Sequence, residues 1–255
     1  MRKYPWIGLW IGLWSGLRSG LRIGAWIFAL LPLFSPQGLA SQLAVEPELK
    51  LALRIVHFQG EHSSPILAPK EARHLIEEVN GFFTSCRVSF VLERLDSVNA
   101  ALQGFPERPS SLEELDPIRA RLKDPKRLLI VQTGAWRGTL ATANAWTVLP
   151  GEGPLGTVME STYARHARLV AHELAHALDL DHVTDRQNLL HPVLHPDSSA
   201  LTQEQCTHLR SAALRFHSLA LRDADSTANS ARNLASTTLQ AQGELKDGNG
   251  ITSGR

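Results

Sequence analysis

The stretch HELAHALDLDH, residues 172–182, determines which fold and which chemistry the sequence predicts. His172 and His176 are four residues apart, so on a helix their imidazoles lie on one face, about one turn from each other. Glu173 directly follows the first histidine, and His182 follows a short polar break after the second. This spacing allows three ring nitrogens to meet at one point with a carboxylate beside them.

Three neutral imidazoles around one point are typical of catalytic zinc, which takes three protein ligands and keeps a fourth position for water. A carboxylate next to the first ligand is placed to act as general base on that water. The motif predicts one catalytic Zn²⁺ ion held by His172, His176 and His182. Glu173 is then the catalytic base of a hydrolase, most simply a peptidase. Glu204 on a later helix is the alternative third ligand, and the spacing of His182 disfavours it.

Written as HExxHxxDxxH, the motif resembles the zinc-binding signature of the metzincin metallopeptidases, HExxHxxGxxH. The sequence HELAHALDLDHV around the motif is similar to that of secreted, matrixin-like bacterial proteases. The resemblance covers about residues 50–218, including an Asn-Leu-Leu element after the third histidine and a closing helix that starts Leu-Thr-x-x-Gln. It implies an α+β fold, in which a mixed twisted sheet and an active-site helix precede a small, mostly irregular or helical C-terminal subdomain. It also implies a zinc endopeptidase that acts on protein or peptide substrates.

Two positions depart from that family. Asp179 stands where the family has a glycine that turns the chain sharply, usually at positive φ, and Asp tolerates this conformation better than most residues. Leu190 stands where the family has a methionine below the metal, and Leu conserves the apolar volume. We expect an altered site that still functions. The alternatives are an inactive zinc-binding relative that acts as a binding module, and an enzyme that acts on a non-peptide amide or ester.

Residues 1–40 have the pattern of a secretory signal, with basic residues first, then an apolar run at residues 23–34. Small residues at Gly38 and Ala40 fit cleavage after Ala40. The apolar run is shorter than the roughly 20 residues that span a bilayer. We therefore expect a secreted or periplasmic protein. The alternative is an uncleaved amino-terminal anchor, which would be the only membrane contact we expect.

The composition is that of a globular protein without the excess of basic residues that is typical of nucleic-acid binding. Hydrophobic residues make up 43% and charged residues 20% of the chain. The first forty residues hold four basic and no acidic side chains, so the remainder carries a net charge of about −3, which argues against nucleic acid as a partner. We expect a zinc metallopeptidase domain at residues 41–221. A mostly disordered tail follows at residues 222–255, where Ala, Ser, Asn, Gly and Thr dominate.

The chain has two cysteines, Cys86 and Cys206, so no C-x-x-C metal or redox motif is possible. In an exported chain we expect them to form one long-range disulfide. In the cytosol they would be two unrelated small buried residues.

Apolar periodicity predicts strands that alternate with helices. Ser111 and Glu114 have the spacing of a capping box at one helix start. Thr202 and Gln205 have the same spacing at another. By the resemblance, the strand at residues 141–149 is the edge along which an extended substrate would lie. The predicted strands are residues 49–58, 86–95, 127–133, 141–149 and 155–160, and the predicted helices are residues 70–83, 112–122, 163–180 and one that opens at residues 201–202.

Other polar residues near the motif are given ordinary roles. We expect His191 and His195 to be exposed loop residues rather than extra ligands or proton carriers. His166 is expected to face elsewhere on the helix. For Asp181, a hydrogen bond to a metal ligand and an exposed loop carboxylate are equally compatible with the sequence.

Overall fold

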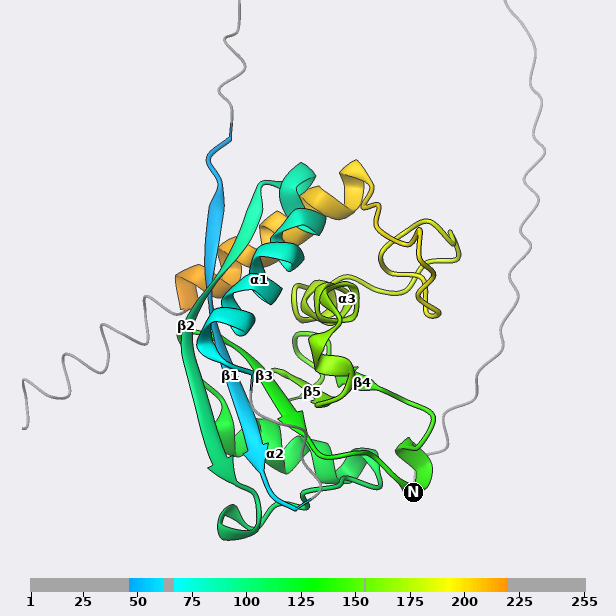
Figure 1. The fold of residues 1–255 in the computed structure, drawn as a ribbon. Helices are drawn as coiled ribbons and strands as arrows, with labels where there is room; N and C mark the ends of the chain where they lie inside the picture. Colours follow the sequence, from blue (N-terminus) through cyan, green and yellow to red (C-terminus); the bar gives the residue numbers. More distant parts are fainter. Residues whose placement is uncertain (1–45, 62–66, 154, 220–255) are drawn as a thin grey trace, which may run out of the picture. The chain divides into compact units, whose positions relative to one another are not determined.

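Within the described residues, a five-stranded mixed sheet has the spatial order β2-β1-β3-β5-β4 (Figure 1). The structure is a computed structural model, and it describes residues 46–61, 67–153 and 155–219, all in one compact unit. The predicted signal at residues 1–40 and the predicted tail at residues 222–255 lie outside this part. The strands are β1 (Leu49–Gln59), β2 (Val88–Asn99), β3 (Leu128–Thr133), β4 (Ala145–Thr147) and β5 (Thr157–Glu160).

Strands β2, β1, β3 and β5 run parallel to one another, and β4 pairs antiparallel with β5. Every residue of β3 is buried, as expected for a parallel strand covered on both faces. At the β2 edge, the Asn80 side chain accepts a hydrogen bond from the Phe90 N–H at 2.7 Å and donates one to the Phe90 carbonyl at 3.0 Å. Asn80 therefore covers that edge at Phe90. The predicted fold class, a mixed sheet combined with helices, is confirmed.

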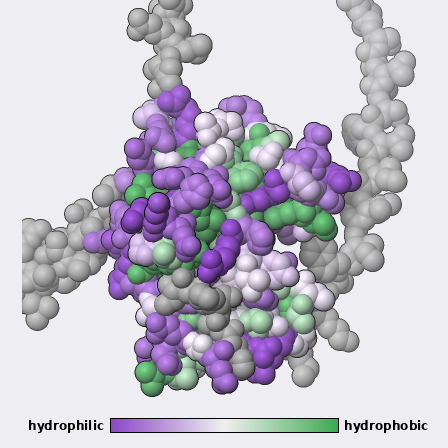
Figure 2. Space-filling model, viewed as in Figure 1, coloured by the Kyte–Doolittle hydropathy of each residue, from purple (hydrophilic) through white to green (hydrophobic). Residues whose placement is uncertain are grey.

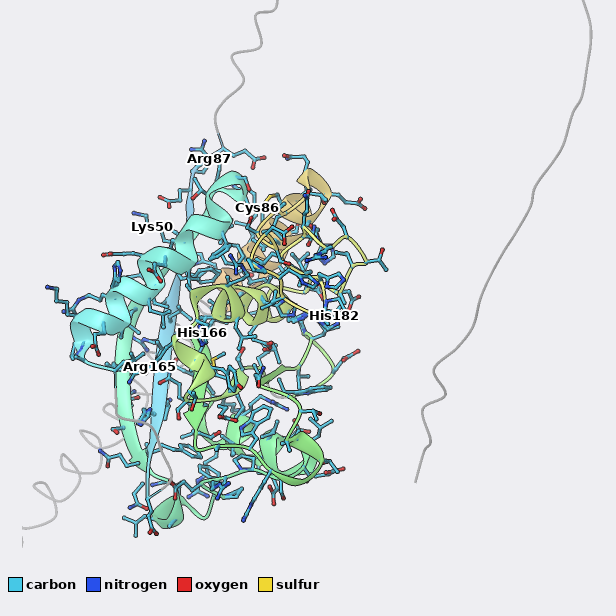
Figure 3. All side chains as sticks on the ribbon, turned by 45° about the vertical axis from the view of Figure 1, so that its right-hand side comes forward. Lys50, Cys86, Arg87, Arg165, His166 and His182 are labelled. Carbon is cyan, nitrogen blue, oxygen red and sulfur yellow. A yellow bond between two sulfur atoms is a disulfide. The ribbon has the colours of Figure 1, made fainter. Side chains whose placement is uncertain are left out.

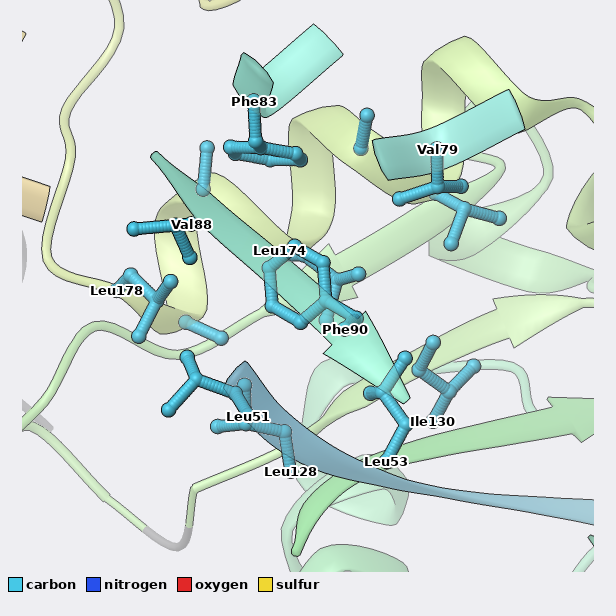
Figure 4. Packing of buried hydrophobic residues seen from close by; sticks show 14 of the residues in the cluster. Leu51, Leu53, Val79, Phe83, Val88, Phe90, Leu128, Ile130, Leu174 and Leu178 are labelled. Carbon is cyan, nitrogen blue, oxygen red and sulfur yellow. The ribbon is translucent and has the colours of Figure 1, made fainter. Parts of the chain in front are cut away.

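Helices cover both faces of the sheet. On one face lie α1 (Pro69–Phe83) and α3 (Ala167–Ala177), and on the other lies α2 (Leu115–Leu122). Figure 4 shows the core on the first face, where Phe83 of α1 and Leu174 of α3 meet side chains of β1, β2 and β3. Burial of a side chain of this size stabilises the fold by roughly 1.5–3 kcal/mol. This packing fixes α3, which carries the motif, against the sheet.

Local hydrogen bonds show how two helices start. The predicted capping box at Ser111 is wrong, because the Glu114 carboxylate instead accepts hydrogen bonds from the N–H and hydroxyl of Ser110, at 2.6 and 3.2 Å. The box at the last helix is confirmed. The N–H of Thr202 donates to the Gln205 side chain at 2.9 Å, and the N–H of Gln205 donates to the Thr202 hydroxyl at 3.1 Å.

That last helix covers residues 203–219 and packs on the same face of the sheet as α1 and α3. A disulfide joins its Cys206 to Cys86, which lies in a 3-10 turn (Thr84–Cys86) directly after α1. The pairing expected for an exported chain is therefore present. Because Cys86 belongs to this turn, β2 starts at Val88 rather than at residue 86.

Two predicted elements around the site are shorter than expected. The strand predicted at residues 141–149 is reduced to Ala145–Thr147, and a 3-10 turn (Gly138–Leu140) precedes it. It does lie at a sheet edge, as expected. The helix predicted at residues 163–180 is interrupted at His166, whose extended backbone separates a 3-10 turn (Tyr163–Arg165) from α3.

The face of the molecule drawn in Figure 2 is largely polar. In Figure 2 hydrophilic side chains cover most of the visible face, and hydrophobic ones form small separate areas. Among the described residues, no helix is sufficiently long and apolar to cross a membrane.

Candidate metal centre

Helix α3 presents His172 and His176 from its buried side. Both side chains are at most 9% exposed, and Glu173 between them is 6% exposed. His182 follows the end of the helix and remains more accessible. Figure 3 shows His182 and His166 at opposite ends of α3, so His166 takes no part in this cluster.

The chain reaches His182 by a turn of the Schellman type at the end of α3. Asp179 has φ +70°, its N–H donates to the His176 carbonyl at 2.9 Å, and the N–H of Leu180 donates to the Ala175 carbonyl at 3.1 Å. This left-handed position usually holds glycine. Asp179 thus adopts the positive φ that we expected an Asp to tolerate at this position.

Two backbone carbonyls orient the helical histidines. His172 Nδ1 lies 2.7 Å from the Leu189 carbonyl oxygen, and His176 Nδ1 lies 2.6 Å from that of Leu180. A carbonyl can only accept, so each Nδ1 carries the proton and each Nε2 keeps its lone pair. In metal sites, such a hydrogen bond fixes the tautomer and the ring orientation of a ligand.

The three Nε2 atoms face one another. They are separated by 3.0 Å for His172 and His176, and by 3.2 Å from each of these to His182. Four ligands at the usual Zn–N distance of about 2.0–2.1 Å in tetrahedral geometry are about 3.3 Å apart, so the triangle matches one such centre. Two lone pairs that face each other at 3.0 Å, with no proton between them, repel unless a cation lies between. The residues present therefore fit a metal ion, and the three histidines form the one such cluster among the described residues.

Burial also keeps these rings neutral. It lowers the pKa of His172 to about 4, even though the hydrogen bond to the Leu189 carbonyl favours the charged form. Burial likewise lowers the pKa of His176 and of His182, against the attraction of the nearby Asp181 carboxylate. At neutral pH the donor set is thus ready to bind a metal without first losing protons.

Glu173 has a partner that the sequence did not indicate. The Thr147 hydroxyl on β4 donates to Glu173 Oε2 at 2.6 Å. Its oxygen lies 2.7 Å from the Thr157 hydroxyl on β5, which must supply the proton of that second bond. Burial raises the pKa of Glu173 to about 7, and the bond from Thr147 opposes this rise. A carboxylate with this pKa suits proton transfer near neutral pH.

The edge strand beside Glu173 has outward-facing backbone groups. The N–H of Glu160 donates to the Asn144 carbonyl at 2.9 Å, so residues 144 and 160 form a hydrogen-bonded pair. Such pairs alternate along antiparallel strands, so the backbone groups of Ala145 and Thr147 point away from β5. An extended chain can pair with these groups directly next to the Glu173 carboxylate.

Leu190, expected to lie below the metal, is part of the hydrophobic core. It is fully buried, belongs to the same core cluster as Leu174, and its carbonyl accepts a hydrogen bond from the Val183 N–H at 3.1 Å. Its own N–H donates to the Asn188 side chain at 2.9 Å. The loop that carries Leu189 and Leu190 is thus tied by a backbone hydrogen bond to Val183, the residue after His182.

The remaining polar residues near the motif stay outside the cluster. The His191 and His195 rings lie 5.3 Å apart and are half-buried rather than exposed, but neither joins the three ligands. Glu204 is exposed and also lies outside the cluster, which is against its being the third ligand. Asp181 is exposed and acts on His176 and His182 by its charge.

Comparisons with known proteins give a likeness of structure only. No protein-family model matches the chain, and no curated protein matches its sequence. Among solved structures, metalloproteinase-II from Bacteroides fragilis is similar with a TM-score of 0.46 at 13% identity, covering 66% of this chain and 55% of that one. An archaemetzincin from Methanopyrus kandleri is similar with a TM-score of 0.47 at 15% identity, covering 66% of this chain and 98% of that one. The chain thus spans little more than half the length of the first protein. Both scores lie below 0.5, so the assignment of the site rests on the residues of this chain.

Proposed function

We propose that the protein is a zinc-dependent endopeptidase of the metzincin type. The observation that carries the proposal is the triangle of His172, His176 and His182 nitrogens, set beside the buried Glu173 carboxylate. A structural metal site has no use for a base at that position, whereas hydrolysis requires one. The matrixin-like character suggested by the motif is part of this proposal.

A zinc ion bound by the three imidazoles would supply a Lewis acid that activates water and polarises a carbonyl. The chain's own residues account for the proton transfers. Because the Thr147 hydroxyl holds Glu173 Oε2, Oε1 is the atom left to accept a proton from the attacking water. The same carboxyl group then passes the proton to the leaving amine.

The substrate would be a protein or peptide in extended form. Its backbone would pair with the outward-facing groups of Ala145 and Thr147 on β4, which places a peptide bond near Glu173. We also propose a secreted or periplasmic location, supported by the Cys86–Cys206 disulfide, since such bonds persist in oxidising compartments.

The test uses the full chain on casein and on a set of quenched-fluorescent peptides. We expect cleavage that a zinc chelator abolishes and that Zn²⁺ restores. The matched variant Glu173→Gln keeps the side-chain volume, so it should retain zinc but lose cleavage. Full zinc content without cleavage of any broad substrate would instead support a binding module. Cleavage confined to non-peptide amides or esters would support the third alternative.

A further inference from the structure

Asp179 makes contacts that no glycine at the end of α3 would make. Its carboxylate oxygen Oδ2 accepts hydrogen bonds from Arg215 Nη2 at 2.8 Å and from His208 Nε2 at 3.1 Å. Both partners belong to the helix at residues 203–219. The left-handed conformation disfavours a side chain, so these contacts compensate for a strained position.

The turn held in this way places two metal ligands. Leu180, the next residue, supplies the carbonyl that orients His176, and His182 follows two residues later. A shift of Asp179 would therefore move the orienting carbonyl of one ligand and the backbone of another. The carboxylate is about one-third exposed, so each contact has a moderate strength.

A second pair of contacts connects the same helix to the other orienting carbonyl. The Asn188 amide donates to Gln205 Oε1 at 2.8 Å, and the Gln205 amide donates back to Asn188 Oδ1 at 3.2 Å. Asn188 directly precedes Leu189, whose carbonyl orients His172. The carbonyls of Leu180 and Leu189, which orient His176 and His172, thus each follow a residue that is hydrogen-bonded to the helix at residues 203–219.

The helix itself is firmly anchored on its other side. The Cys86–Cys206 disulfide ties it to the turn after α1, and both cysteines are buried. The Arg210 guanidinium donates to the carbonyls of Cys86, Arg87 and Pro47 at 3.2, 2.9 and 3.1 Å. The helix can therefore serve as a fixed support for the metal-binding turn.

We propose that the helix at residues 203–219 is a brace for the metal centre, and that Asp179 and Arg215 are positioning residues for zinc. The inference rests on the proposed function, because it requires that the three histidines bind the ion. The brace holds the turn in the geometry that the ligands need, so that breaking it speeds the loss of zinc while the fold remains intact.

The experiment follows the transfer of Zn²⁺ from the loaded full-length protein to an excess of a chromogenic chelator. Asp179→Gly and Arg215→Met should each release zinc about three- to tenfold faster than the wild type. Asp179→Asn keeps an acceptor at the same place and should fall in between. Glu204→Gln is the matched control, because it removes a carboxylate from the same helix and the same groove beside Asp179 but leaves the contacts of Asp179 and Asn188 in place, and it should release zinc at the wild-type rate.

The two variants distinguish the brace from a general loss of stability and from a simple effect of charge. Asp179→Gly relieves the left-handed backbone, so the melting temperature of its metal-free form should be unchanged or higher, although it loses zinc faster. Arg215→Met removes a positive charge, so simple electrostatics predicts slower loss of Zn²⁺, whereas the brace predicts faster loss.

Release of zinc by both variants within a factor of about 1.5 of the wild type, or slower release by Arg215→Met, would overturn the brace alone. A wild type that binds no zinc would overturn the proposed metal centre and the brace with it.

Discussion

Replacing Thr147 by valine tests how the Glu173 carboxylate, the proposed general base, is held. The change removes a hydroxyl that donates to Glu173 Oε2 at 2.6 Å and keeps the branched shape of the side chain. Loss of a hydrogen bond to a buried charged group costs about 1.5–3 kcal/mol. If the carboxylate must be held in this way at the transition state, kcat/KM should fall about 10- to 100-fold. Zinc content should remain that of the wild type, because Thr147 is not one of the three histidines of the cluster.

The pH profile adds a second readout. Without the Thr147 donor the charged form of Glu173 is less favoured, so its pKa rises further above about 7 and the acid limb of kcat/KM moves to higher pH. Thr147→Ser restores the hydroxyl and should recover most of the activity. Thr157→Val removes only a bond to a neutral hydroxyl, so a loss of about 2- to 10-fold is expected. The assay is cleavage of a quenched-fluorescent peptide. A Thr147→Val protein with full zinc and kcat/KM within about threefold of the wild type would refute this reasoning.

Three further outcomes follow from the described contacts. Cys86→Ala removes the Cys86–Cys206 disulfide, which closes a loop of 120 residues, so the free energy of unfolding measured in urea should fall by about 4 kcal/mol. An unchanged midpoint of urea unfolding would contradict this. In metal-free protein the lowered pKa of His172 gives stability that is present above pH about 6.5 and lost towards pH 4, whereas the raised pKa of Glu173 makes the fold more stable as the pH falls from about 7. Between pH 7 and pH 4.5 the free energy of unfolding of Glu173→Gln should therefore fall by about 3 kcal/mol more than that of the wild type. Parallel curves of unfolding free energy against pH for the two proteins would contradict the shifts. Leu190→Met conserves volume in the core, so the free energy of thermal unfolding should change by less than about 1.5 kcal/mol and the zinc content should stay the same. Loss of zinc from this variant would contradict the expectation that only the volume of residue 190 matters.

The clustering of the three histidines was predictable because its geometry is local. Four residues along a helix bring His172 and His176 to one face, and a left-handed residue at the helix end brings His182 back to them. The central strand β3 was predictable for a similar reason, since the unbroken apolar run at residues 128–131 suits a parallel strand buried on both faces.

Contacts between segments far apart in the chain could not be predicted from the sequence. Thr147 is 26 residues from Glu173, and only the fold of β4 against α3 brings the hydroxyl to the carboxylate. Arg215 is 36 residues from Asp179, and a basic residue on an amphipathic helix carries no sign of its partner. The break in the predicted helix at His166 has no glycine or proline to mark it, and we have no physical account of it.

The central claim is that three histidines bind one metal ion, and zinc content measured by mass spectrometry tests it most directly. Wild-type protein should hold close to one zinc ion per chain after exhaustive dialysis. The His182→Ala variant keeps both helical ligands and their carbonyl partners but removes one corner of the nitrogen triangle, so it should hold far less. Zinc retained equally by His182→Ala, or absent from the wild type, would contradict the assignment.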